Sequence, residues 1–137
     1  MKKLGTVLLI DDDEITNFIN EDLIRVMGIT RRILIAKNGQ EGIDILKKQC
    51  QDETYCPVLI FLDINMPVMN GFEFLEEYQQ LDLPNHPSMI LVMLTSSDNE
   101  KDVDRIKQST AVDYLRKPLT KENLRGILEK HFGGVPQ

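Results

Sequence analysis

The sequence has 137 residues, of which 42% are hydrophobic and 28% are charged, so it is long enough for one domain with its own core. Its 16 basic and 22 acidic side chains give a formal net charge of -6. Basic residues occur in pairs at most, so direct binding of nucleic acid is not expected. No apolar run approaches the roughly 18 residues of a membrane span, and the N-terminal run is too short for a signal peptide. We therefore expect a protein of the cytoplasm that does not act in a membrane.

The cysteines of the chain are Cys50 and Cys56. They lack the paired C-x-x-C arrangement that is typical of zinc sites and of redox motifs. The sequence therefore predicts a reducing compartment and no site built on cysteine.

The first predicted strand, residues 6–10, is an apolar run that stops at the acidic residues 11–14. From residue 14 to residue 27, apolar side chains recur at helical spacing, and Gly28 is a typical helix stop. A second short strand is predicted at residues 32–36, and it ends without an acid.

After a turn at Asn38-Gly39, a second helix is predicted with Gly42, Ile43 and Leu46 on one face. A polar connection leads from it to a buried strand at residues 58–62. This strand runs directly into Asp63, and the Pro67 and Asn70-Gly71 that follow are typical of a loop. Such an aspartate can be a simple turn or cap residue. A carboxylate at the end of a buried strand is nevertheless costly unless it is solvated, paired or bound to a cation, so Asp63 needs a partner.

A third helix is predicted at residues 72–81, followed by an apolar strand at residues 89–94 that ends at Thr95. Residues 98–108 then form a helix with an acidic first turn, which suits the positive end of its dipole.

Residues 113–116 are the last predicted strand, and they lead to Lys117-Pro118. Thr120 is predicted to cap a final helix at residues 121–132. Five strands thus alternate with five helices, which predicts an α/β fold with a doubly wound parallel sheet covered by helices on both faces.

In an open parallel sheet, ligands bind outside the carboxyl ends of the strands. Four of the five predicted strands end in side chains that can do chemistry, and the strand that ends near Ala36 is expected at the edge of the sheet. Three converging carboxylates repel one another unless a hard cation such as Mg²⁺ binds them, while a lysine and a hydroxyl can hold phosphate oxygens. A carboxylate can itself accept a phosphoryl group, and Asp63 is the best placed to do so. The converging residues are Asp11, Asp12, Asp63, Thr95 and Lys117.

Four sequence runs together resemble the receiver domain of two-component response regulators, and they span essentially the whole chain in the order of that family. The resemblance implies a flavodoxin-like fold with strand order 2-1-3-4-5. It also implies a receiver domain at residues 4–133 and a short tail at residues 134–137 with no output domain, so we expect a stand-alone regulator. The four runs are Leu8-Leu9-Ile10-Asp11-Asp12-Asp13-Glu14, Leu62-Asp63-Ile64-Asn65-Met66-Pro67-Val68-Met69-Asn70-Gly71, Thr95-Ser96 and Tyr114-Leu115-Arg116-Lys117-Pro118.

By the same resemblance, Asp63 is phosphorylated by a sensor histidine kinase or a histidine phosphotransfer protein. Mg²⁺ is held by Asp12, Asp63 and the backbone carbonyl of Asn65, with Asp11 acting through a water molecule. Asp13 is left as a cap of the helix that follows.

The resemblance also implies that Lys117 contacts the phosphoryl group and that the bond from Lys117 to Pro118 is cis. Thr95 and Tyr114 form the implied switch, in which Thr95 moves toward the phosphoryl group and Tyr114 turns into the vacated space. The surface of the fourth helix, fifth strand and fifth helix then changes for a downstream protein target. We expect a signalling domain rather than an enzyme, as a monomer or as a dimer that forms on phosphorylation.

Two other functions fit parts of this pattern. A phosphatase of the haloacid dehalogenase type also uses an aspartate nucleophile with Mg²⁺, but it needs a second aspartate as general acid where this chain has Asn65. A non-phosphorylated interaction module would keep the fold without needing the complete set of acids, hydroxyl and lysine. Treatment with acetyl phosphate and Mg²⁺ distinguishes the three functions.

Overall fold

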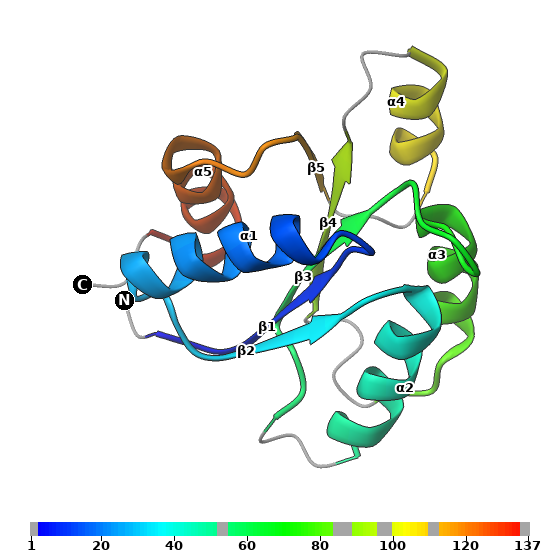
Figure 1. The fold of residues 1–137 in the computed structure, drawn as a ribbon, viewed down its shortest axis with the longest axis horizontal. Coiled ribbons are helices and arrows are strands. Elements are labelled where there is room, and N and C mark those ends of the chain that lie inside the picture. The colour runs from blue at the N-terminus through cyan, green and yellow to red at the C-terminus, as the bar shows by residue number, and fades with distance from the viewer. Residues whose placement is uncertain (1–2, 52–54, 84–88, 96–99, 110–112, 135–137) are drawn as a thin grey trace.

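The computed structural model describes residues 3–51, 55–83, 89–95, 100–109 and 113–134. In this part of the chain a parallel sheet has the strand order β2-β1-β3-β4-β5, and helices cover both of its faces (Figure 1). The flavodoxin-like order 2-1-3-4-5 is thus confirmed, while residues 135–137 of the predicted tail lie outside the described residues. The elements are β1 (Leu4–Ile10), α1 (Glu14–Met27), β2 (Thr30–Ala36), α2 (Gly39–Gln49), β3 (Leu59–Asp63), α3 (Gly71–Gln80), β4 (Ile90–Thr95), α4 (Glu100–Lys107), β5 (Asp113–Arg116) and α5 (Lys121–Phe132).

The boundaries of β1 and β2 differ from the predicted ones for one shared reason. Both strands begin two residues earlier than predicted because they pair there, with Leu4 opposite Thr30 and the N–H of Leu4 donating to the carbonyl of Ile29 at 2.8 Å. β2 is an edge strand, as expected for the strand without a terminal acid. None of the helices in the described ranges is long and apolar enough to cross a membrane.

Two hydrophobic layers lie on opposite faces of the sheet. Along β1, Leu8 and Ile10 pack into the layer under α2 and α3, whereas Val7 and Leu9 pack into the layer under α1 and α5. This alternation follows from the two-residue period of a strand. Because both faces of the central strands are buried, these strands have continuous apolar sequences rather than alternating ones.

The buried face of α1 differs from what its apolar pattern suggests. Asn17, Asn20 and Ile24 are its buried residues, whereas the apolar residues on the outer side of the helix are exposed. The periodicity predicted the helix correctly, but most of the apolar side chains that define it face solvent. The exposed ones are Ile15, Phe18, Ile19 and Val26.

The cysteines correct one sequence-based expectation. Cys50 at the end of α2 and Cys56 before β3 form a disulfide and are both buried. The absence of a C-x-x-C spacing therefore did not indicate reduced thiols, because the Cα atoms of Cys50 and Cys56 lie 4.4 Å apart in the fold. The cysteines therefore do not indicate a reducing compartment.

Reducing this disulfide should lower the free energy of unfolding by about 2 kcal/mol, because a closed short loop restricts the unfolded chain. Urea unfolding with and without a dithiol reductant measures the difference. The Cys50→Ser/Cys56→Ser double variant should match the reduced protein and show no response to the reductant. Equal stability of the oxidised and reduced wild type would contradict the prediction.

Candidate functional site

Two buried carboxylates lie side by side at the carboxyl edge of the sheet. Asp63 is the last residue of β3, and Asp11 directly follows β1, the strand that pairs with β3. Their exposed fractions are 5% and 3%. Asp12 is exposed, yet its carboxylate oxygen lies within 4.8 Å of an oxygen of each of the other two. Adjacent strands have thus placed three acids around one point.

Lys117 connects the two buried acids. Its Nζ lies 3.0 Å from Oδ2 of Asp11 and 3.0 Å from Oδ1 of Asp63. Its backbone N–H donates to the carbonyl of Thr95 at 2.8 Å, which fixes the segment after β5 against the end of β4. The Lys117–Pro118 peptide bond is cis, as the resemblance implied.

Burial and charge shift the pKa values of this cluster. Burial raises the pKa of the Asp63 carboxyl, the charges of Asp11 and Asp12 raise it further, and Lys117 only partly opposes them. Burial by itself would lower the pKa of Lys117, but its hydrogen bonds to Asp63 and Asp11 outweigh this and raise it. Lys117 therefore stays charged, but it provides one positive charge beside three acids.

The backbone around Asp11 is held at several points. Its N–H donates to the carbonyl of Ala36 at 3.1 Å, its carbonyl accepts from Nδ2 of Asn17 at 2.8 Å, and its Oδ1 accepts from the N–H of Asp13 at 3.0 Å. Asp13 itself is the N-cap of α1, accepting from the N–H of Ile15. The sequence prediction assigned Asp13 correctly and missed Asn17, whose signal is a polar residue on the inner side of a helix.

The loop from β3 to α3 passes close to Asp63. Gly71 donates its N–H to the carbonyl of Ile64 at 2.8 Å, and an added Cβ at Gly71 would lie 2.8 Å from the carbonyl oxygen of Asp63. Val68 has a φ of 68°, and the N–H of Met69 donates to the carbonyl of Pro67 across it. Val68 is thus the central residue of a tight turn whose backbone conformation β-branched residues rarely adopt. Asn65 is exposed in this loop.

Gly71→Ala should lower the free energy of unfolding by about 2 kcal/mol, since backbone atoms block the new methyl group. Gly126→Ala is the matched control: Gly126 lies in α5, and an added Cβ there would meet nothing within 4 Å, so alanine should gain about 0.5–1 kcal/mol. Urea unfolding of both variants tests the opposite signs. A loss at Gly126 or none at Gly71 would contradict the argument.

Thr95 and Tyr114 lie on neighbouring strands. Thr95 is the buried end of β4, and Tyr114 is half-buried in β5 and packs against the layer under α2 and α3. Tyr114 is opposite Met93, two residues before Thr95, so the side chains of Thr95 and Tyr114 leave the sheet on the same face. Ser96 of the sequence motif lies outside the described residues.

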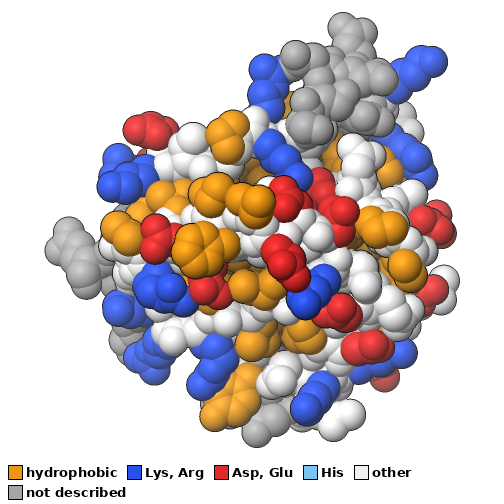
Figure 2. All heavy atoms as spheres, in the orientation of Figure 1, with side chains coloured by type: hydrophobic (Ala, Val, Ile, Leu, Met, Phe, Trp, Pro, Cys, Tyr) orange, Lys and Arg blue, Asp and Glu red, His pale blue; other side chains and the backbone are white. Residues whose placement is uncertain are grey.

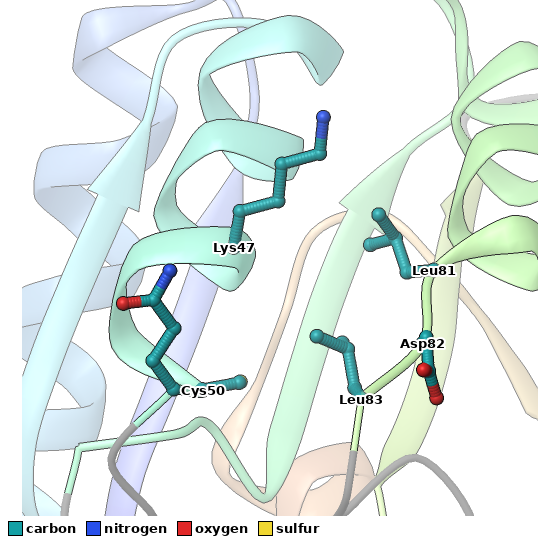
Figure 3. Close-up of a pocket in the computed structure, with 6 residues that line it drawn as sticks. Lys47, Cys50, Leu81, Asp82 and Leu83 are labelled. Carbon is teal, nitrogen blue, oxygen red and sulfur yellow. The ribbon is translucent and has the colours of Figure 1, made fainter.

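A pocket of about 510 Å³ lies elsewhere, between the end of α2 and the segment after α3 (Figure 3). Lys47 and Cys50 line it on one side, and Leu81 and Leu83 line it on the other. Because Cys50 bonds to Cys56 before the start of β3, the pocket lies toward the opposite edge of the sheet from Asp63. It does not belong to the acidic site.

Comparison with known proteins identifies the family. Residues 7–129 match the response regulator receiver domain, and the chain belongs to this family. It is 34% identical over 131 residues to the probable C4-dicarboxylate response regulator DctR of Priestia megaterium, covering 95% of this chain and 53% of that protein. It is 29% identical over 129 residues to a probable chemotaxis protein CheY of Rhizobium etli, covering 94% and 93%.

Among solved structures, the fold is similar to that of a two-component response regulator from Cytophaga hutchinsonii. The TM-score is 0.87 at 32% identity, and the match covers 96% of this chain and 99% of the other. The chain spans about half the length of the DctR relatives. The comparisons therefore establish a receiver domain of the CheY type.

Proposed function

We propose that this receiver domain is switched by phosphorylation of Asp63, with a phosphohistidine of a sensor kinase or a phosphotransfer protein as donor and with Mg²⁺ bound. The observation that carries this proposal is the pair of buried carboxylates that share Lys117 beside the exposed Asp12. A purely structural ion pair would need one acid for one lysine.

The composition of the site fits Mg²⁺. Three carboxylates against one ammonium leave a net formal charge of minus two, which matches a divalent cation. The side-chain atoms of these three acids that could bind the metal are carboxylate oxygens, the ligands that Mg²⁺ prefers. In this proposal Asp12, Asp63 and the carbonyl of Asn65 hold the ion directly and Asp11 holds it through water, and the ion supplies positive charge to the phosphoryl oxygens.

The transfer step forms one bond and breaks one. A carboxylate oxygen of Asp63 attacks the phosphorus, the P–N bond of the phosphohistidine breaks, and its electron pair returns to the imidazole of the donor. Lys117, charged and 3.0 Å from Asp63, is placed to contact the phosphoryl oxygens. Slow hydrolysis of the acyl phosphate would be the only turnover, so we propose a switch and not an enzyme acting on external substrates.

The exposed apolar residues on the outer face of α1 support the proposal that the phosphodonor is a protein. A donor protein must bring its histidine to Asp63, and α1 begins beside the acids with Ile15, Phe18 and Ile19 exposed by 70%, 69% and 56%. Figure 2 shows apolar side chains along α1 next to acidic ones. Contiguous exposed apolar surface commonly marks a protein interface, so we propose that the donor docks on these residues.

The relation of Thr95 to Tyr114 supports the proposed switch. A phosphoryl group on Asp63 offers new acceptor oxygens next to β4, whose residue Leu94 pairs with Asp63. If the Thr95 hydroxyl moves to donate to one of them, it leaves space on the face of the sheet that Tyr114 shares, and the tyrosine turns inward.

The proposed output surface consists of α4, β5 and α5. α4 is short, with Ile106 buried in the layer under α2 and α3 and with Arg105 stacked 3.9 Å over the ring of Phe72 at the start of α3. Movement of Tyr114 would thus change a surface for a downstream protein target. We further propose that the domain acts in the cytoplasm, as a monomer or as a dimer formed on phosphorylation.

The test is incubation of the purified protein with acetyl phosphate, with Mg²⁺ or with EDTA, followed by intact-mass measurement and assay of released phosphate. A receiver switch gains a single phosphoryl group that is stable in acid and labile in base, and only with Mg²⁺. A phosphatase would release phosphate catalytically, and an interaction module would do neither. Either of the last two results would refute the proposal.

A further inference from the structure

Asn17 is a polar residue on the inner face of α1, the face that packs on the sheet. Its exposed fraction is 4%, and its Nδ2 donates to the backbone carbonyl of Asp11 at 2.8 Å. The bond joins the helix to the first residue after β1, within the acidic site. This use of the side chain is uncommon, since helix residues of this kind more often cap helix ends or face solvent.

The amide oxygen of Asn17, Oδ1, indicates that packing alone does not account for an asparagine at this position. Oδ1 is buried and has no hydrogen-bond partner in the described part of the chain. A buried polar atom without a partner is unfavourable and is uncommon in folded proteins. An apolar residue of similar size, such as leucine, would fill the space without this cost, so what Asn17 contributes is the bond from Nδ2.

The bonded carbonyl belongs to the peptide unit that links Asp11 to Asp12. Because a peptide unit is planar, holding its oxygen also sets the direction of the N–H and Cα of Asp12. The Asp11 side chain has further contacts with the N–H of Asp13 and with Lys117. The carboxylate of Asp12 is exposed, so its position near Asp63 depends on its backbone.

We propose that Asn17 is a positioning residue for the cation site: by holding the Asp11 carbonyl, it aims the carboxylate of Asp12 at the point shared with Asp11 and Asp63. This inference rests on the proposed binding of Mg²⁺. Groups that orient metal ligands without touching the metal typically change affinity by about 10–100-fold when they are replaced. Asn17 would act in this way through the backbone.

The experiment is a titration of the whole chain with MgCl₂, followed by backbone amide shifts in NMR spectra, for wild type, Asn17→Leu and Asn20→Leu. Asn20 is the matched control, since it is 5% exposed and lies one turn further along the same helix face. We expect Asn17→Leu to weaken Mg²⁺ binding about tenfold and Asn20→Leu to leave it nearly unchanged. Urea unfolding of each variant measures the loss of stability separately.

The Mg²⁺ affinities of the two variants and of wild type decide whether Asn17 positions the cation site. Wild-type affinity in Asn17→Leu would overturn this inference, and so would an equal weakening in Asn20→Leu, which would indicate general loosening of α1. If wild type itself did not bind Mg²⁺, the proposed metal site would be wrong, and this inference with it. If wild type bound Mg²⁺ and Asn17→Leu bound it equally well, only this inference would be wrong. Should Asn17→Leu not fold, Asn17→Ala removes the amide without added bulk and is judged by the same criteria.

Discussion

Asp63→Asn should abolish the gain of a phosphoryl group from acetyl phosphate and Mg²⁺, measured by intact mass. The amide of asparagine is a poor nucleophile, whereas its size is close to that of the carboxylate, so the fold should persist. Asp11 cannot replace Asp63, because its Oδ1 accepts from the N–H of Asp13 and its Oδ2 contacts Lys117. A mass increase in the variant equal to that of wild type would show that Asp63 is not the acceptor.

Asp13→Asn is the matched control for this variant. Asp13 is the next acid after the site, and its side chain caps α1 by accepting from Ile15 and Thr16. Asparagine is as good an N-cap as aspartate, so Asp13→Asn should fold normally and be phosphorylated like wild type. Loss of phosphorylation in both variants would indicate a general effect of acidic charge near the site.

The raised pKa of Asp63 gives the same variant a second readout. Because the folded-state pKa lies above the ordinary value of 3.8, the contribution of Asp63 to stability is fully present below pH 3.8. It is lost as the pH rises through the raised folded-state value. Without Mg²⁺, wild type should therefore lose stability across this window relative to Asp63→Asn. Thermal unfolding at a series of pH values, with and without Mg²⁺, measures the difference, and Mg²⁺ should stabilise wild type more than the variant.

Lys117→Met should lower the free energy of unfolding at pH 7 by about 3 kcal/mol in the absence of Mg²⁺. Removing one partner of a buried ion pair typically costs about 3–5 kcal/mol because the other charge stays buried and uncompensated. We take the lower end because the side chain of Lys117 is 24% exposed, whereas those of Asp11 and Asp63 are 5% and 7% exposed. Urea unfolding measures the change.

The pH dependence of this loss has a definite sign. The pKa of Lys117 is raised above 10.5, so its contribution to stability is complete below pH 10.5 and is lost only as the pH rises through the folded-state value. The deficit of Lys117→Met should instead shrink when the pH falls and Asp63, whose pKa is raised, takes up a proton. Mg²⁺ should also reduce it, by replacing the missing positive charge.

Lys121→Met serves as the control for the removal of a lysine. Lys121 is the exposed first residue of α5, and exposed substitutions usually change stability by no more than about 0.5 kcal/mol. If Lys117→Met were no less stable than Lys121→Met, or if its deficit persisted at low pH, Lys117 would not be the compensating charge of the acids.

Local patterns in the amino-acid sequence were enough to predict the architecture and most of the site. Continuous apolar runs that end in Asp11, Asp63 and Thr95 are strands buried on both faces, and their alternation with helices requires parallel pairing. Parallel pairing brings the carboxyl ends of the strands to one edge, and the strand order that the family resemblance implied places the acids and Lys117 near one another there. The limits of α1 also followed from local signals, because the helix cap Asp13 and the stop Gly28 act within a few residues.

The packing of the folded chain, and no local pattern, established which way each surface faces and which side chains on neighbouring elements meet. The apolar periodicity of α1 could not show that Asn17 and Asn20 lie inside while Phe18 and Ile19 face solvent, because periodicity defines a stripe and not its partner. Asn17 reaches Asp11 only through the packing of α1 beside β1. The disulfide between Cys50 and Cys56 likewise depends on how close the end of α2 lies to the residues before β3, and this is set by the fold and not by spacing along the chain.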